Sequence, residues 1–204
     1  MRQVVINGTF TVDAAAQLAG KPSMMNPEAG QNRQEHDHAT MEMKSNAAQE
    51  KLTVSDQQKS EISEVLQVYF QLKDALVASD KEQAAKYARS MEERVANVGM
   101  ASMPDAVRER WMKLTPKLKS TLKEINIKAN IDAQRKAFVP LSEAVVSLAH
   151  SFGPFEEPVY VMFCPMAHND QGANRLSASG TRVLNPYYGD MMLRCGEAAT
   201  RTID

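Results

Sequence analysis

Two short segments near the C-terminus each combine a cysteine with methionine. The first holds Cys164 and Met166, and the second holds Met191, Met192 and Cys195. Thiolate and thioether sulfur are soft donors, which bind copper(I), and by the same chemistry silver(I), in preference to hard ions such as magnesium. If the two segments meet in the fold, their sulfur atoms could surround one ion. The sequence therefore predicts a soft-metal site in which Cys164, Met166, Met192 and Cys195 are ligands and Met191 is an optional one.

One histidine lies close enough to these segments to be a further optional ligand. His168 follows Cys164 in a polar His-Asn-Asp-Gln segment, a setting in which a histidine is more often only solvated. Structural zinc sites use four cysteine or histidine ligands, and His168 is the only histidine near the two thiols. Zinc therefore fits this set less well than copper(I) or silver(I).

A second group of soft and borderline donors lies far upstream. It consists of His36, His38, Met41 and Met43, within a polar segment. Imidazole and thioether groups in such a segment would make a weak, fast-exchanging capture site for copper. An ordinary polar linker with two chance methionines, or a cloning remnant, explains the same residues about equally well.

The two cysteines also fit hypotheses that involve no metal. Cys164 and Cys195 could form a simple disulfide, or could be small buried residues in a core that methionines fill. They could also cycle between dithiol and disulfide in a thiol redox protein, which would not depend on the methionines. A Ser-His-Asp triad, a glycine-rich phosphate loop and a glutamate-rich helix pair have no signature here, so we expect no enzyme activity.

Composition narrows the classes of partner. The 204 residues include 24 Lys and Arg against 25 Asp and Glu, a balance that gives no attraction to nucleic acid or an anionic membrane. No stretch approaches the ~20 continuous apolar residues of a membrane span. The first residues lack the apolar core of a signal peptide. We therefore expect neither nucleic-acid binding nor a membrane-spanning segment.

The chain divides into three regions. Residues 1–19 contain two β-branched and apolar runs joined by Asn7-Gly8, which predicts a short β-hairpin. Residues 20–52 are polar and rich in Gly, Pro, Asn and Gln, which is typical of a flexible linker. Residues 53–204 hold the periodic apolar patterns and the cysteines, and we expect them to form the folded domain.

Up to Phe152, apolar residues of this domain recur at three- and four-residue steps, the period of an amphipathic helix. Ser55 with Gln58 predicts a capping box at the start of the first helix. Asp80 and Ser102 are the expected caps of the second and third helices, and the fourth is expected over residues 130–152. Four amphipathic helices joined by short loops favour an up-down four-helix bundle.

The helical period stops at Gly153-Pro154. Residues 159–163 form a β-branched and aromatic run typical of a strand, and glycines and prolines punctuate the segment after it. The predicted fold class is thus mainly α, an up-down four-helix bundle with a turn-rich C-terminal cap that contains one or two short strands. Tyr187 and Tyr188 are expected to pack this cap on the bundle with their hydroxyls at the surface.

An ordered set of motifs in residues 55–200 resembles a known domain family. The motifs are Tyr69-Phe70-Gln71-Leu72-Lys73-Asp74-Ala75-Leu76, Gln134-Arg135-x-x-Phe138-x-x-Leu141-Ser142, Phe163-Cys164-Pro165-Met166-Ala167, Gly172-Ala173, Leu176-Ser177, Asn185-Pro186-Tyr187-Tyr188-Gly189 and Met192-Leu193-x-Cys195-Gly196. The family has no assigned function, and it occurs alone or at the C-terminus of periplasmic adaptor (membrane fusion) proteins of heavy-metal efflux pumps. The resemblance implies a periplasmic setting.

The N-terminal region carries a second resemblance. Val5-x-Asn7-Gly8-x-Phe10-x-Val12-Asp13-x-x-x-Gln17-Leu18 is similar to the end of the membrane-proximal domain of copper/silver efflux adaptors, and the His/Met segment looks like the metal-capture segments of that system. The lipoyl and barrel domains of an adaptor are missing, so residues 1–19 would be a remnant. One departure from the family is Arg175, which replaces an aromatic residue, often Trp, and bears on the packing around the sulfur ligands.

These observations predict a periplasmic copper(I)- or silver(I)-binding accessory module of heavy-metal resistance. It would sequester the ion or hand it to an efflux adaptor or another pump component. Two alternatives stay open. One is a thiol redox protein that uses Cys164 and Cys195, and the other is a structural interaction module held by a disulfide between them.

Overall fold

The computed structural model describes Leu52 and residues 54–128 and 130–203. The hairpin predicted for residues 1–19 and, apart from Leu52, the linker predicted for residues 20–52 lie outside these described residues. So do the four residues of the upstream donor group, His36, His38, Met41 and Met43. Those predictions stay predictions.

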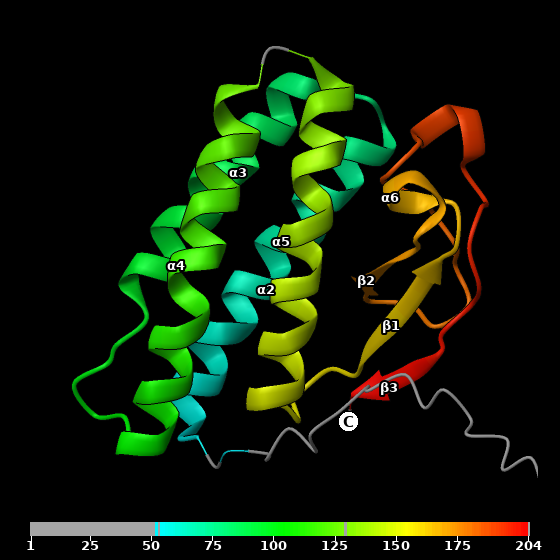
Figure 1. The fold of residues 1–204 in the computed structure, drawn as a ribbon. Helices are drawn as coiled ribbons and strands as arrows, with labels where there is room; N and C mark the ends of the chain where they lie inside the picture. Colours follow the sequence, from blue (N-terminus) through cyan, green and yellow to red (C-terminus); the bar gives the residue numbers. More distant parts are fainter. Residues whose placement is uncertain (1–51, 53, 129, 204) are drawn as a thin grey trace, which may run out of the picture. The chain divides into compact units, whose positions relative to one another are not determined.

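Four long helices make up the first part of the described chain (Figure 1). They are α2 (Asp56–Val77), α3 (Lys81–Asn97), α4 (Asp105–Ile127) and α5 (Ile131–Phe152). Consecutive helices pack against one another, α2 with α3, α3 with α4 and α4 with α5, as short connections require. The prediction of a mainly α fold built on a helical bundle is confirmed. None of the described helices is both long and apolar enough to span a membrane.

Side chains at the helix starts explain why three of the four helices begin where the sequence predicts. Ser55 and Gln58 form a reciprocal capping box at the start of α2. The side chains of Asp80 and Asn130 each accept a hydrogen bond from a backbone N–H three residues further on. The prediction for α4 is wrong. The Ser102 hydroxyl lies 3.5 Å from the side-chain amide of Gln58, and α4 begins without a side-chain cap.

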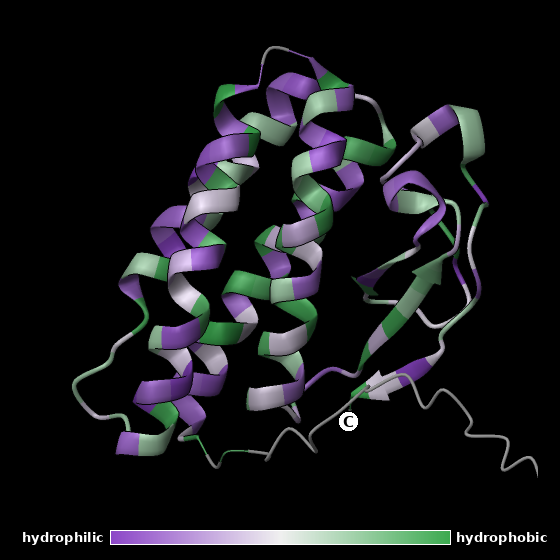
Figure 2. Ribbon diagram, viewed as in Figure 1, coloured by the Kyte–Doolittle hydropathy of each residue, from purple (hydrophilic) through white to green (hydrophobic). Residues whose placement is uncertain are grey.

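Apolar side chains from all four helices fill the bundle. Figure 2 shows hydrophobic and hydrophilic residues alternating along each helix, as expected where one face is buried and the other is exposed. Most residues of α5 are buried, because this helix has the bundle on one side and the C-terminal part of the chain on the other. The largest fully buried apolar side chains of the bundle are Trp111, Tyr69, Phe138, Phe152, Ile62, Leu72 and Leu76.

Residues 153–203 form the C-terminal cap, which lies on the side of α5 away from α4 (Figure 1). Its antiparallel sheet has β1 (Val159–Cys164) between β2 (Ala173–Ser177) and β3 (Arg201–Ile203). One or two strands were expected, and the third, β3, is too short to show an alternating pattern in sequence. The single turns α6 (Ala167–Asp170) and η1 (Gly189–Met192) complete the cap.

Tyr69 joins the bundle to the sheet. Its ring stacks on Phe138 of α5 with centroids 5.4 Å apart. Its hydroxyl lies 2.6 Å from the Ser142 hydroxyl of α5 and accepts a hydrogen bond from the Leu176 N–H of β2 at 3.2 Å. Burial raises the pKa of Tyr69 to about 12, so the phenol is neutral at physiological pH. One side chain from α2 therefore fixes both α5 and β2.

The Tyr69→Phe variant is expected to be less stable by about 1–3 kcal/mol, because the buried Leu176 N–H and Ser142 hydroxyl lose their shared partner. Urea unfolding followed by circular dichroism measures this change. Tyr87→Phe is the matched control, since the half-buried Tyr87 hydroxyl has no hydrogen-bond partner among the described residues. Equal losses in the two variants would contradict the role given to Tyr69.

Candidate metal centre in the C-terminal cap

The fold brings Cys164 and Cys195 together, although 31 positions separate them in sequence. Cys164 is the last residue of β1 and is fully buried, whereas Cys195 follows η1 and is partly exposed. Both are free thiols, and their Sγ atoms lie 3.6 Å apart. We refer to these two side chains as the thiol pair.

The separation of the two sulfur atoms suits the chelation of one ion. With the Zn–S bond of about 2.3 Å as a reference, two thiolates at a tetrahedral angle around a metal stand about 3.8 Å apart. The observed Sγ to Sγ distance is 3.6 Å. Both sulfur atoms could therefore bind a single ion after only a small shift.

Asn185 positions the buried half of the thiol pair. This side chain is fully buried, and its Nδ2 donates a hydrogen bond to Cys164 Sγ at 3.3 Å. Its Oδ1 accepts from the Tyr187 N–H at 2.9 Å, which fixes the orientation of the amide. The Asn185 amide therefore holds the Cys164 sulfur in one position beside Cys195. Sequence reasoning missed Asn185 as a site residue, although the Asn-Pro-Tyr-Tyr-Gly motif contains it.

The two tyrosines of that motif anchor the loop that leads to Cys195. Tyr187 is buried, its ring lies 5.8 Å from that of Phe138, and its hydroxyl donates to the Asn174 carbonyl of β2 at 2.6 Å. The expectation that both hydroxyls lie at the surface is therefore wrong for Tyr187, because β2 covers it. The Tyr188 hydroxyl donates to the Met166 carbonyl and so ties η1 to the turn after β1.

A tight turn presents Cys195 to its partner thiol. The Cys195 N–H donates to the Met192 carbonyl at 2.9 Å, and the Glu197 N–H then donates to the Phe163 carbonyl of β1 at 2.9 Å. Gly196 between them has φ +125°, and a Cβ there would lie 2.8 Å from the Phe163 carbonyl oxygen. Only glycine fits this conformation and this close approach.

Arg175 of β2 lies fully buried beside the same turn. A Cβ at Gly196 would stand 3.1 Å from its Nη2, so the guanidinium packs directly on this glycine. Nη2 lies 3.9 Å from the Met162 sulfur, and Nη1 has no hydrogen-bond partner among the described residues. Sequence reasoning noted Arg175 only as a change in packing. The structure shows an arginine side chain buried next to the turn that carries Cys195.

The surroundings of the thiol pair determine how readily Cys195 ionises. Burial raises the pKa of the Cys195 thiol above its ordinary value, and the neighbouring Cys164 raises it further. A hydrogen bond from the Met166 backbone and the charge of Arg175 act in the opposite direction. The net effect is a higher pKa, so Cys195 is protonated at neutral pH and binding of a metal would release its proton.

The backbones of two predicted methionine ligands adjoin the thiol pair: the Met166 backbone bonds the Cys195 sulfur, and the Met192 carbonyl accepts from the Cys195 N–H. Met166 and Met192 are 40% and 37% exposed, whereas Met191 is 72% exposed. The described residues contain no cluster of three or more His, Cys, Asp or Glu suited to a metal ion. A third donor for an ion at the thiol pair would therefore be a methionine sulfur or a ligand from another molecule.

His168 and Met191, the two optional ligands, face a different space. Together with residues of α5, they line a cavity of about 560 Å³. His168 and Asn169 have φ values of 56° and 54°, so α6 is a left-handed turn rather than a regular helix. The turn leaves the His168 side chain exposed. The remaining residues of the cavity are Asp132, Arg135, Lys136, Val139, Pro140, Asn169, Tyr187 and Tyr188.

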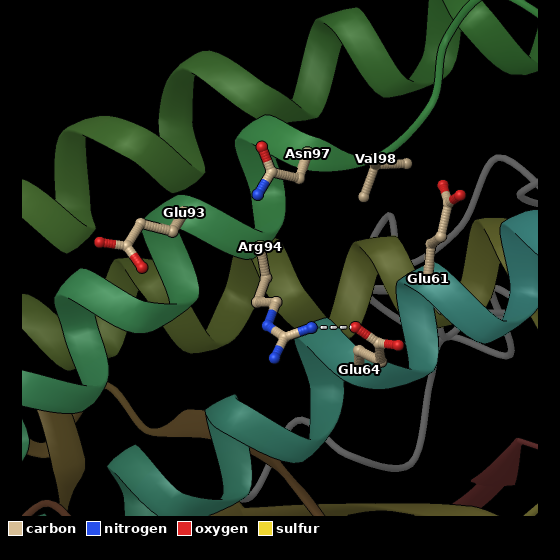
Figure 3. Close-up of a pocket in the computed structure, with 6 residues that line it drawn as sticks. All are labelled: Glu61, Glu64, Glu93, Arg94, Asn97 and Val98. Atoms are coloured by element: carbon tan, nitrogen blue, oxygen red, sulfur yellow. Dashed lines mark hydrogen bonds and ion pairs between the residues drawn. The ribbon is translucent and has the colours of Figure 1, made fainter.

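A second hollow, of about 310 Å³, lies between α2 and α3 (Figure 3). It is lined by Glu61, Glu64, Glu93, Arg94, Asn97 and Val98. Three of its charged groups already make contacts between α2 and the segment formed by α3 and Gly99. Arg94 forms an ion pair with Glu64, and the Glu61 carboxylate accepts from the Gly99 N–H at 2.8 Å just beyond α3. These contacts explain the hollow as part of the helix packing.

Comparison with known proteins relates the helical part of the chain to one family. A family described as "Protein of unknown function (DUF3347)" matches residues 65–157. The match runs from within α2 through the end of α5 and stops before β1, so both thiols lie outside it. No curated protein and no solved structure matches the chain. The family description mentions neither a metal nor an efflux system.

Differential alkylation tests the geometry of the thiol pair. In the reduced native protein, iodoacetamide is expected to modify Cys195 and to spare Cys164, because Cys164 is 0% exposed. The thiolate is the reacting form. The pKa of Cys195 lies above the ordinary value of 9.0 for a thiol. The alkylation rate of Cys195 should therefore be low at neutral pH and should rise steeply as the pH approaches and passes 9.0.

Mass spectrometry of peptides after timed alkylation measures both rates. Protein unfolded in urea is the control, and there the two cysteines should react alike. Equal modification of both cysteines in the native state would contradict the buried position of Cys164.

Proposed function

We propose that the protein binds one copper(I) or silver(I) ion between Cys164 and Cys195. The observation that carries this proposal is the separation of 3.6 Å between two free thiol sulfurs, one buried and one partly exposed. Thiolates are the soft donors that such ions prefer. The Asn185 amide, which donates to Cys164 Sγ at 3.3 Å, holds one donor in place before any ion arrives.

A methionine is the third donor in this proposal. Met192 is joined to Cys195 by a backbone hydrogen bond, and the Met166 backbone contacts the Cys195 sulfur. Both side chains are exposed and unbranched, so they can turn toward the thiols at little cost in packing. Met192 and Met166 therefore fit the role of adjustable ligands beside two fixed ones.

The work of the module would be to sequester the ion or to hand it over, with no bond made or broken in a substrate. Partial exposure of Cys195 gives an acceptor access to the bound ion. We propose an adaptor or another component of a periplasmic efflux pump as that acceptor. Support for this partner comes from the motif resemblance and from ligand softness. His36, His38, Met41 and Met43 would serve as an auxiliary capture arm.

A thiol redox function is the second candidate. Two free thiols whose sulfur atoms lie 3.6 Å apart need only a local movement to reach the bonding distance of a disulfide, about 2.05 Å. This candidate requires the two cysteines and gives the methionines no role. Substitution of Met192 therefore separates the two functions.

An anaerobic copper(I) titration of the reduced protein, in competition with a chromophoric chelator, is expected to show one ion bound per chain. The Cys164→Ser/Cys195→Ser variant should not compete. Met192→Leu should bind at least about tenfold more weakly, a loss that even outer-shell changes reach at metal sites. Met112→Leu is the matched control, because Met112 is 59% exposed on α4 and far from the thiols in sequence.

Failure of the reduced wild-type protein to compete would contradict the metal proposal. A reversible thiol couple in the oxidoreductase range of about −270 to −120 mV, unchanged by Met192→Leu, would then favour the redox function.

A further inference from the structure

Arg175 differs from the other buried basic side chains of the described chain in having no counter-charge. Arg135 is also buried, but it donates to the Leu76 carbonyl and the Ser79 hydroxyl and pairs with Asp132 at 3.4 Å. Buried Lys73 pairs with the neighbouring carboxylate of Asp74 at 3.3 Å. No carboxylate among the described residues pairs with Arg175.

Burial of an unpaired charge is costly, so a folded protein seldom keeps one without a use for it. Arg175 is 0% exposed, and its Nη1 has no hydrogen-bond partner within the described part of the chain. Its Nη2 lies 3.9 Å from a thioether sulfur, Met162 Sδ. A sulfur of this kind is a weak acceptor and carries no charge. Within the described part of the chain, the guanidinium is thus left without a carboxylate in ion-pair contact.

The sheet places this charge on the side of the thiols. Arg175 stands opposite Met162 in the antiparallel pairing of β1 and β2, and opposed residues share a face. Cys164 is two residues beyond Met162, so it lies on that face as well. The guanidinium also packs on Gly196, the neighbour of Cys195. Both halves of the thiol pair are therefore adjacent to structure that Arg175 touches.

Formal charges decide which ion this arrangement favours. Two thiolates contribute two negative charges, so a monovalent ion between them leaves one negative charge, which one guanidinium balances. A divalent ion between the same thiolates gives a neutral complex, and the guanidinium then stays uncompensated. A disulfide between the two cysteines is also neutral, so it too would leave the charge of the guanidinium uncompensated.

We propose that Arg175 is a built-in counter-charge that makes the thiol pair selective for monovalent soft ions over divalent ones. This inference rests on the proposed function, since it concerns the ion bound by Cys164 and Cys195. Arg175 would act on the bound complex through its charge, as a specificity-determining residue and not as a ligand. Its low-dielectric surroundings strengthen that effect.

The test compares affinities for copper(I), by chelator competition, and for cadmium(II), by the ultraviolet absorbance of the cadmium–thiolate bond. Arg175→Met should lower the copper(I) affinity by about tenfold or more and leave the cadmium(II) affinity equal or higher, since a partly buried charge pair is worth more than the 1.4 kcal/mol of a tenfold change. Arg175→Lys, which keeps the charge, should retain much of the preference. Arg135→Met is the matched control and should not alter the ratio of the two affinities.

A second pair of variants tests the same point with the guanidinium in place. Met162→Glu puts a carboxylate beside Arg175 and supplies the counter-charge in advance, so it should lower the preference for copper(I). Met162→Gln has the same shape without the charge and should leave the preference unchanged.

Thermal unfolding of the metal-free proteins adds an independent readout. There, Arg175→Met should melt no lower than wild type, whereas Arg135→Met should melt lower.

The possible outcomes separate the two proposals. If the wild-type protein binds copper(I) and the ratio of affinities is the same in wild type, in folded Arg175→Met and in Met162→Glu, the counter-charge is overturned and the metal site stands. If the wild-type protein binds neither ion, the proposed function is overturned, and the role of Arg175 with it.

Discussion

The contact between the sheet and α5 controls the geometry of everything in the C-terminal cap. Its central element is the buried phenol of Tyr69, which meets α5 and accepts a hydrogen bond from β2. Tyr187 repeats this arrangement from the other direction, since it comes from the cap, packs near Phe138 and donates to β2. β1 pairs with β2 and ends at Cys164, so the position of the first thiol follows from how β2 is docked. The second thiol reaches it through the loop that Tyr187 and its neighbours anchor.

Features that depend on nearby residues could be predicted from the sequence. The predicted caps at Ser55 and Asp80 each involve a side chain and a backbone group three positions away, as does the cap that Asn130 makes at the predicted start of the fourth helix, and all three helices begin as expected. The cap predicted at Ser102 failed because α4 begins only at Asp105, with Pro104 at the cap position, and the Ser102 hydroxyl instead lies near a side chain 44 positions away. The hydroxyl of Tyr187 was misplaced for the same reason, since its partner lies in a strand whose packing no local pattern reveals.

In the candidate site too, some features could be predicted from the sequence and others depend on the fold. Residue type alone identified Cys164, Cys195 and their methionine neighbours as soft donors, because donor chemistry belongs to the side chain whatever its surroundings. The meeting of the two cysteines depends on the fold, as do the hydrogen bond from Asn185 and the burial of Arg175. An asparagine in a turn and an arginine in a strand are ordinary in sequence. Only their lack of contact with water gives them electrostatic importance.

The two thiols are unequally buried, so one of them faces solvent and the other faces the interior of the cap. Cys164 is enclosed by the sheet and by Asn185, while Cys195 lies in a turn that solvent reaches. Any ion or reagent that comes from solution therefore encounters Cys195 first. In ligand exchange, the outer sulfur would bind first on arrival and be the first replaced on departure, with the inner sulfur as the last bond to break. Ions would therefore enter and leave such a site by exchanging one sulfur ligand at a time, and the exposure of Cys195 would control the rate of that exchange.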